Sequence, residues 1–162
     1  MQAKKTARKA RLLRWAMNIY PPYFGAGIKV RSISPDFREV QVSMGLKWYN
    51  RNYVRTQFGG SLYSMTDPFY MLMLMENLGR DYIVWDKAAH IEFVSPGKGT
   101  VHAEFKINHA MLDDIREHTA NGEKYLPKYK ATIRDDNGTL VAHVEKTLYI
   151  RRKPEAQLAR AT

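Results

Sequence analysis

The stretch RTQFGGSLYSMTDPFYMLMLMENLG, residues 55–79, decides the fold. Two adjacent glycines, Gly59 and Gly60, precede an almost unbroken apolar run, which ends at Asn77-Leu78-Gly79, a sequence typical of a helix stop. A helix that is apolar on every side cannot lie on a wet surface. The stretch therefore predicts a helix buried at the centre of the domain.

One carboxylate, Asp67, interrupts this apolar run between Met65 and Phe69. Because a buried, unpaired carboxylate costs several kcal/mol, Asp67 must be paired, lie at a subunit interface or line a wet cleft. Pro68 follows it and lacks a backbone N–H, so we expect the helix to bend or break there. Asp67 is then either a local cap or structural hydrogen-bonding group, or a general base beside an oxyanion site.

The two glycines also have a possible chemical use. The first turn of a helix leaves backbone N–H groups unpaired, and the missing side chains let a ligand oxygen approach them. The helix dipole favours an oxygen that gains negative charge at this point. A tight turn or close backbone packing is the alternative interpretation of Gly59 and Gly60.

The remaining sequence alternates as antiparallel strands do. Strands are predicted at residues 27–33, 37–46, 82–94, 100–107, 125–135 and 139–151, the last two joined by the turn Asp136-Asn137-Gly138. In 82–94 the alternation puts these apolar residues on one face: Ile83, Trp85, Ala89, Ile91 and Phe93. With a short helix at about 110–119, the pattern predicts an α+β domain in which one antiparallel sheet wraps the buried helix.

Length and composition narrow the class of protein. A chain of 162 residues suits one domain, and the absence of cysteine excludes disulfides, thiolate metal sites and cysteine nucleophiles. The lack of cysteine fits a reducing compartment, so we expect a cytoplasmic protein. No apolar run reaches the length of about 18 residues that a membrane-spanning helix needs.

The net charge of +10 is concentrated at the ends of the chain. No acidic residue precedes Asp36, whereas eight basic residues do: Lys4, Lys5, Arg8, Lys9, Arg11, Arg14, Lys29 and Arg31. We therefore divide the chain into a basic N-terminal helix or tail (1–19), a domain (20–151) and a basic C-terminal tail (152–162). The first segment is a solvated or partner-facing helix, an organellar transit peptide, or a contact for anionic membrane or nucleic acid. No strand carries the aromatic and basic stripe that stacks bases, so no specific nucleic-acid partner is expected.

One motif carries a resemblance to a known family. The run N52-x2-R55-x2-F58-G59-G60-x6-D67 resembles the N-x2-G-x2-H-G-G-x6-D motif of hotdog-fold acyl-CoA thioesterases of the phenylacetate-degradation type. AHIEFVSPGKGTVHAEFKI, residues 89–107, resembles that family's strand, Pro-Gly turn and strand. The resemblance covers about residues 20–151 and points to a bacterial thioesterase-like branch. It implies a hotdog fold, in which a curved antiparallel sheet wraps a central helix, here with an added N-terminal helix.

The resemblance also implies roles for individual residues. Asp67 would activate water or attack the thioester, Gly60 would polarise the thioester carbonyl through its N–H, and Asn52 would orient the reacting groups. The same motif implies that the acyl-CoA-type substrate contacts Gly59, Phe58, Arg55, Ser61 and Tyr63. In this family each site lies between two subunits, which implies a homodimer or a dimer of dimers. No cofactor or metal is implied, and His109, Asp113 and Glu117, spaced i, i+4 and i+8, are interpreted as a solvated helix face.

Two positions depart from the family motif. Phe58 stands where the motif has His, and Arg55 stands where it has Gly. Arg55 would serve an anionic substrate group or a surface salt bridge. Because the His is absent, a non-catalytic acyl-CoA- or lipid-binding hotdog protein is the alternative to a thioesterase. A third hypothesis is a peripheral membrane or nucleic-acid binder that acts through residues 1–19.

Overall fold

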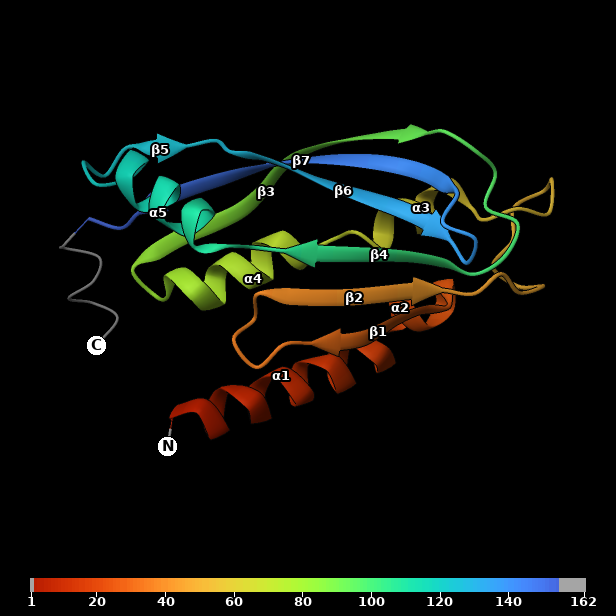
Figure 1. Ribbon diagram of the computed structural model, residues 1–162, viewed down its shortest axis with the longest axis horizontal. Coiled ribbons are helices and arrows are strands. Elements are labelled where there is room, and N and C mark those ends of the chain that lie inside the picture. Colours follow the sequence, from red (N-terminus) through yellow and green to blue (C-terminus); the bar gives the residue numbers. More distant parts are fainter. Residues whose placement is uncertain (1, 155–162) are drawn as a thin grey trace.

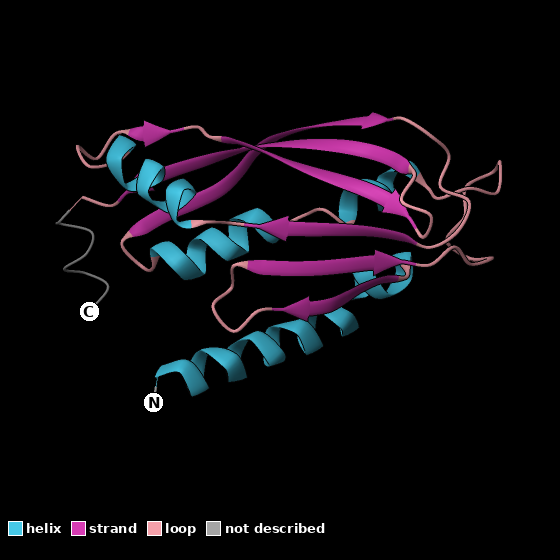
Figure 2. Ribbon diagram, in the orientation of Figure 1, coloured by secondary structure: helices cyan, strands magenta, loops and turns pink. Residues whose placement is uncertain are grey.

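The computed structural model describes residues 2–154, in which strands form one curved antiparallel sheet around helix α4 (Figures 1 and 2). The strand order is β1-β2-β4-β6-β7-β3, and β5 pairs with β7. The strands are β1 (Ile28–Ile33), β2 (Glu39–Met44), β3 (Tyr82–Phe93), β4 (Val101–Lys106), β5 (Lys124–Tyr125), β6 (Lys128–Asp135) and β7 (Leu140–Arg152). The helices are α1 (Gln2–Ile19), α2 (Pro21–Ala26), α3 (Gly59–Ser64), α4 (Phe69–Leu78) and α5 (His109–His118).

The opening stretch folds as its sequence predicts, with the break at Pro68. A short helix, α3, begins at the two glycines, and α4 begins directly after a cis peptide bond between Asp67 and Pro68. The side chains of α4 that enter the core are Phe69, Tyr70, Met73 and Leu74. The buried central helix is therefore confirmed, and its break holds Asp67 outside regular helix.

Helix α1 covers the free edge of β1, as Figure 1 shows. The Asn18 side chain donates to the Val30 carbonyl (3.1 Å) and accepts from the Val30 N–H (2.9 Å), as a neighbouring strand would. The Arg14 guanidinium donates to the Arg31 carbonyl at 3.1 Å. Because an open strand edge invites pairing with another chain, this side-chain mimicry protects one end of the sheet.

Strand β3, at the other end of the sheet, differs from its sequence pattern. Trp85 and Phe93 were predicted on one apolar face, yet they are 61% and 55% exposed, whereas Val84 is buried. The register of β3 against β7 shifts between Asp86 and Ala88, which breaks the period-2 alternation. No element of residues 2–154 pairs with the outer edge of β3. Trp85 pairs with Tyr149 and Phe93 with Ala142, so the two side chains point to opposite faces of the sheet, and the prediction of one shared apolar face for residues 82–94 was wrong.

Smaller features agree with the sequence. Asn108 caps α5 by accepting from the Met111 N–H at 2.9 Å, and the Asp135–Thr139 turn closes the β6–β7 hairpin. The basic tail predicted from residue 152 lies largely outside the described residues. No helix within residues 2–154 combines the length and the hydropathy needed to cross a membrane.

Candidate functional site

Asp67 is held by a lysine from a distant strand. Lys146, on β7, places its Nζ 2.5 Å from the Asp67 Oδ1, and the Lys146 side chain is 0% exposed while that of Asp67 is 42% exposed. The Tyr23 hydroxyl donates to the backbone carbonyl of Asp67. The carboxylate of Asp67 therefore has one face fixed by a buried cation and the other open to a ligand.

A second carboxylate and a phenol complete the surroundings of Lys146. Asp86, on β3, has its Oδ1 3.2 Å from Nζ, and this oxygen makes no hydrogen bond to a described residue. The Lys146 Nζ also donates to the Tyr63 hydroxyl at 3.3 Å and lies 5.1 Å from the centre of the Tyr63 ring. One ammonium thus faces two carboxylates, and the cluster carries a net negative charge when both are ionised.

Burial and charge act in opposite directions on this cluster. Burial favours a neutral lysine, but the hydrogen bond to Asp67 and the charges of Asp86 and Asp67 outweigh it and raise the pKa of Lys146. Burial raises the pKa of Asp86, although the nearby Lys146 opposes that shift. Lys146 is therefore protonated at neutral pH and holds Asp67 in place through its positive charge.

Sequence reasoning did not identify Lys146 or Asp86. The sequence does contain a signal for the lysine. Every second residue of β7 from Val144 to Ile150 faces the core, and Lys146 occupies one of these inward-facing positions. A charged residue in that phase needs a buried partner. No local pattern of this kind indicates Asp86.

Asp67 lines a cavity of about 400 Å³ that the N-terminal helices help to form. Its walls are Met17, Tyr20, Pro22 and Tyr23 from the α1–α2 region, and Tyr63, Ser64, Asp67 and Pro68 around the helix break. The lining is mostly aromatic and aliphatic, with a single carboxylate. Such a cavity suits an apolar group whose reacting end meets Asp67.

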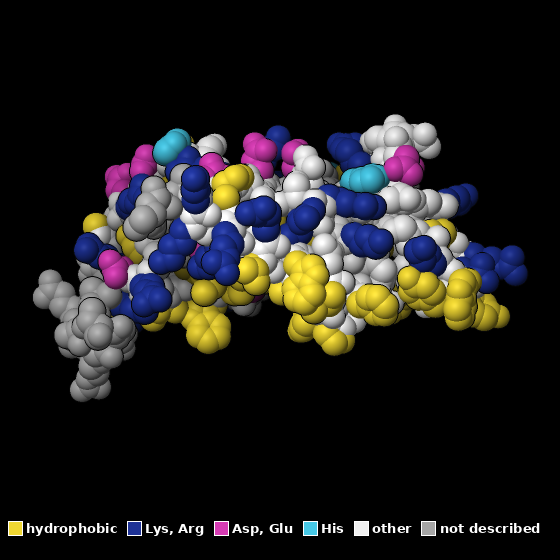
Figure 3. Space-filling view, turned by 90° about the horizontal axis from the view of Figure 1, so that it is seen from below, with side chains coloured by type: hydrophobic (Ala, Val, Ile, Leu, Met, Phe, Trp, Pro, Cys, Tyr) yellow, Lys and Arg dark blue, Asp and Glu magenta, His cyan; other side chains and the backbone are white. Residues whose placement is uncertain are grey.

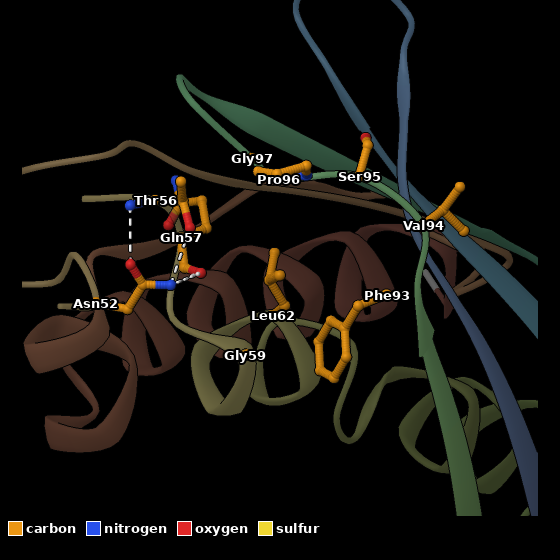
Figure 4. Close-up of a pocket in the computed structure, with 10 residues that line it drawn as sticks. All are labelled: Asn52, Thr56, Gln57, Gly59, Leu62, Phe93, Val94, Ser95, Pro96 and Gly97. Atoms are coloured by element: carbon orange, nitrogen blue, oxygen red, sulfur yellow. Dashed lines mark hydrogen bonds between the residues drawn. The ribbon is translucent and has the colours of Figure 1, made fainter. Parts of the chain in front are cut away.

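A second cavity, of about 330 Å³, lies at the start of α3 (Figure 4). Ten residues line it: Asn52, Thr56, Gln57, Gly59, Leu62, Phe93, Val94, Ser95, Pro96 and Gly97. The Asn52 amide donates to the Thr56 Oγ1 (2.9 Å) and accepts from the Thr56 N–H (2.9 Å), so it stabilises the loop before α3. Within one chain the structure therefore brings Asn52 and Gly59 to this cavity, and Tyr63 and Asp67 to the other.

The glycines at the start of α3 make room for aromatic rings. A Cβ on Gly60 would lie 2.6 Å from the Phe58 Cε1, and a Cβ on Gly59 would lie 3.0 Å from the Phe93 Cζ. Phe58 itself is 54% exposed. The ring that replaces the motif's histidine thus covers part of the surface next to Gly60, while Ser61, the following residue, is half-buried.

The second departure from the motif has a backbone explanation. Arg55 has φ of +65°, in the left-handed region where glycine is most easily accommodated. The glycine of the motif is therefore explained by the left-handed backbone that this turn needs. Arg55 adopts the same backbone conformation here, and its side chain is exposed. Nothing in the geometry of residue 55 depends on a charge.

Gln57 is a further residue of the α3 cavity that sequence reasoning missed. It is 3% exposed, and its amide nitrogen donates to the carbonyls of Met44 (3.1 Å) and Gly99 (2.9 Å). Its Oε1 is buried without a hydrogen-bond partner among the described residues. An N–H donor of a bound ligand could satisfy this oxygen.

Across residues 2–154, no three His, Asp or Glu side chains converge as ligands of one ion. His118 instead stacks on Tyr125, with ring centres 4.3 Å apart, and its Nδ1 contacts Asp114.

Known proteins share this architecture. The family model described as "Domain of unknown function (DUF4442)" matches residues 8–150. A probable thioesterase of unknown function from Pseudomonas aeruginosa is 16% identical, with a TM-score of 0.76 over 88% of this chain and 95% of that one. A Haemophilus influenzae thioesterase is 14% identical (TM-score 0.65, 88% and 90% covered). The E. coli PaaI protein of the phenylacetic acid degradation operon is 17% identical (TM-score 0.62, 93% and 95% covered). No curated protein is significantly similar to the sequence.

Proposed function

The chain belongs to the DUF4442 family and has the hotdog fold, and from this premise we propose that it hydrolyses acyl-CoA-type thioesters. The observation that carries the proposal is Asp67: a half-exposed carboxylate, anchored by the wholly buried Lys146, at the mouth of an apolar cavity. It stands at the motif position of the carboxylate that reacts in similar thioesterases. The thioesterases with a similar fold support the class of reaction.

The proposed chemistry uses Asp67 as base and the start of α3 as oxyanion site. Asp67 removes a proton from water, the hydroxide attacks the thioester carbonyl carbon, and the Gly60 N–H stabilises the oxygen that becomes negative. The carbon–sulfur bond then breaks, and the thiolate takes the proton from Asp67. Direct attack by the Asp67 carboxylate on the same carbon is the covalent variant.

We propose that two subunits build each site. Gly59 and Asp67 line different cavities of one chain, so a thioester that touches both the α3 start and a carboxylate takes them from facing copies. The edge of β3, which no element of residues 2–154 pairs, and the exposed Trp85 beside it offer a surface for that partner. Lys146 is a positioning residue in this scheme, because it contacts Asp67 rather than the substrate.

The test is release of free thiol from short, medium, long and aryl acyl-CoAs. Because the chain has no cysteine, a thiol-reactive dye sees only liberated CoA. Loss of a general base costs about 10²–10⁴-fold, so Asp67→Asn should lower turnover by that factor and leave the fold intact. Asp81→Asn, at an exposed carboxylate, is the matched control and should keep full activity. A fully active Asp67→Asn protein would refute the assignment.

A second candidate is a non-catalytic acyl-CoA- or lipid-binding protein, which the Phe58 ring beside Gly60 favours. In that case calorimetry would detect binding of acyl-CoA with no thiol released over hours. Phe58→His restores the polar group of the motif and separates the two candidates. Turnover that appears only in Phe58→His would identify the natural chain as a binding protein.

A further inference from the structure

The outward side of α1 combines apolar and basic groups. Leu12, Trp15 and Ile19 are spaced i, i+3 and i+7, which places them on one side of the helix, and they are 55%, 63% and 55% exposed. Ala10 and Met17 occupy the opposite side and are buried. Exposed apolar residues that share a helix side in this way mark a contact surface.

The same strip continues beyond α1. Tyr20 (54% exposed) and Phe24 (73% exposed) extend it into α2. The loop after β2 adjoins the end of α2, because the Asn50 side chain donates to the Ala26 carbonyl at 2.9 Å. Trp48, two residues before Asn50 in this loop, is 81% exposed. We call Leu12, Trp15, Ile19, Tyr20 and Phe24 the α1–α2 strip.

Basic side chains lie beside this strip. Lys4, Lys5, Arg8 and Arg11 are exposed on α1, and no acidic residue occurs before Asp36. Figure 3 looks at the molecule from the α1 side and shows Lys and Arg grouped over this face, with hydrophobic side chains along one margin. The arrangement matches a lipid interface, where Trp, Tyr and Phe enter the headgroup region and Lys and Arg meet phosphates.

We propose that α1 and α2 dock this protein on an anionic membrane surface. Charge decides the occupant. A second copy would bring two acid-free, basic helices face to face, which is unfavourable. Nucleic acid would satisfy the lysines and arginines but leave the aliphatic Leu12 and Ile19 without a partner. An anionic bilayer satisfies both sets of side chains.

Docking has a consequence for the Asp67 cavity. Met17, Tyr20, Pro22 and Tyr23 form one wall of that cavity and belong to the docking helices or adjoin them. Tyr20 is shared by the strip and the wall, so the cavity opens beside the lipid. The docking proposal is argued only from the exposed residues of α1 and α2, so it does not depend on the proposed hydrolysis.

The experiment is co-sedimentation of the full chain with phosphatidylcholine vesicles, with or without phosphatidylglycerol. We expect binding that requires phosphatidylglycerol and weakens as salt is added. Replacing Lys4, Lys5, Arg8 and Arg11 by Gln should weaken it at least about 10-fold, and so should replacing Trp15, Ile19 and Phe24 by Ser. The control replaces four exposed lysines elsewhere by Gln and should bind as the wild type: Lys87, Lys98, Lys124 and Lys130.

A tryptophan reporter fixes the location of the contact. The chain has three tryptophans, so Trp48→Phe/Trp85→Phe keeps Trp15 alone. Its emission should shift to shorter wavelength on vesicles and be quenched by brominated lipid. Three outcomes overturn the proposal: no binding to anionic vesicles, equal losses in the control variant, or a fall in molecular mass by light scattering when Trp15, Ile19 and Phe24 are replaced by Ser. The last outcome would show that the strip covers a second copy. Circular dichroism of each variant confirms that it is folded.

Discussion

At the residue scale, the buried Lys146 decides the environment of Asp67. Its ammonium touches Asp67 and approaches Asp86, and it has no contact with solvent. The role of such a lysine is to position Asp67 rather than to stabilise the fold, because a buried ion pair contributes little net stability compared with a well-packed apolar pair. Removing one partner is costly all the same, since the carboxylates that remain lose their counter-ion.

This asymmetry makes a stability prediction. Lys146→Met should lower the free energy of unfolding by about 3 kcal/mol, because Asp86 is left without a cation. Adding Asp86→Asn should recover part of that loss. Denaturant unfolding of the single and double variants measures the coupling. Lys128→Met removes an exposed pair with Glu145, and a loss there as large as in Lys146→Met would contradict the account.

Tyr70 makes a pH prediction. It donates to the Lys130 carbonyl at 2.7 Å, and burial raises the pKa of Tyr70 to about 12. The folded protein favours the neutral phenol of Tyr70. The stability that this phenol contributes is therefore complete below pH 10 and is lost as the pH rises towards 12. Between pH 10 and 12 the free energy of unfolding should therefore fall by about 2 kcal/mol less in Tyr70→Phe than in the wild type, as measured by thermal unfolding at each pH. Tyr53→Phe, at an exposed site, should follow the wild-type curve, and an identical slope in Tyr70→Phe would count against the role of burial.

At the element scale, α1 closes the β1 edge through one side chain. Asn18→Ala removes both hydrogen bonds to Val30 and should destabilise the protein by about 1–3 kcal/mol. Hydrogen exchange at the Val30 amide should quicken, because the edge opens before the rest of the sheet. Gln41→Ala, at an exposed contact with Ser32 on the neighbouring strand, is the control. Unchanged protection of Val30 in Asn18→Ala would show that α1 covers the edge by packing alone.

At the scale of the whole molecule, the open edge of β3 predicts an oligomer. Light scattering should give a mass that is a multiple of 18.8 kDa. Trp85→Glu places a charge at an exposed apolar residue of β3 and should shift the mass to 18.8 kDa and abolish thiol release, since each proposed site needs two copies. Trp48→Glu changes an equally prominent tryptophan outside β3 and should leave the mass unchanged. A monomeric wild type would contradict the shared site.

The sequence alone determined the central helix, its break and most of the strands. These elements depend on local features: the apolar run of residues 69–78, the missing N–H of Pro68, and the alternation of β4 and β7. Residues that are adjacent in sequence determine such features. The helix break and the buried central helix followed from them.

Only the tertiary structure decided what surrounds Asp67. Lys146 lies 79 residues from Asp67 in sequence, and only the pairing of β3, β6 and β7 brings its ammonium to the carboxylate. Asn52 bonds Thr56 of its own loop, and the register shift against β7 separates Trp85 from Phe93, because these outcomes depend on contacts that local periodicity does not report. Periodicity reports which way a side chain points within an element, and long-range packing determines what it meets.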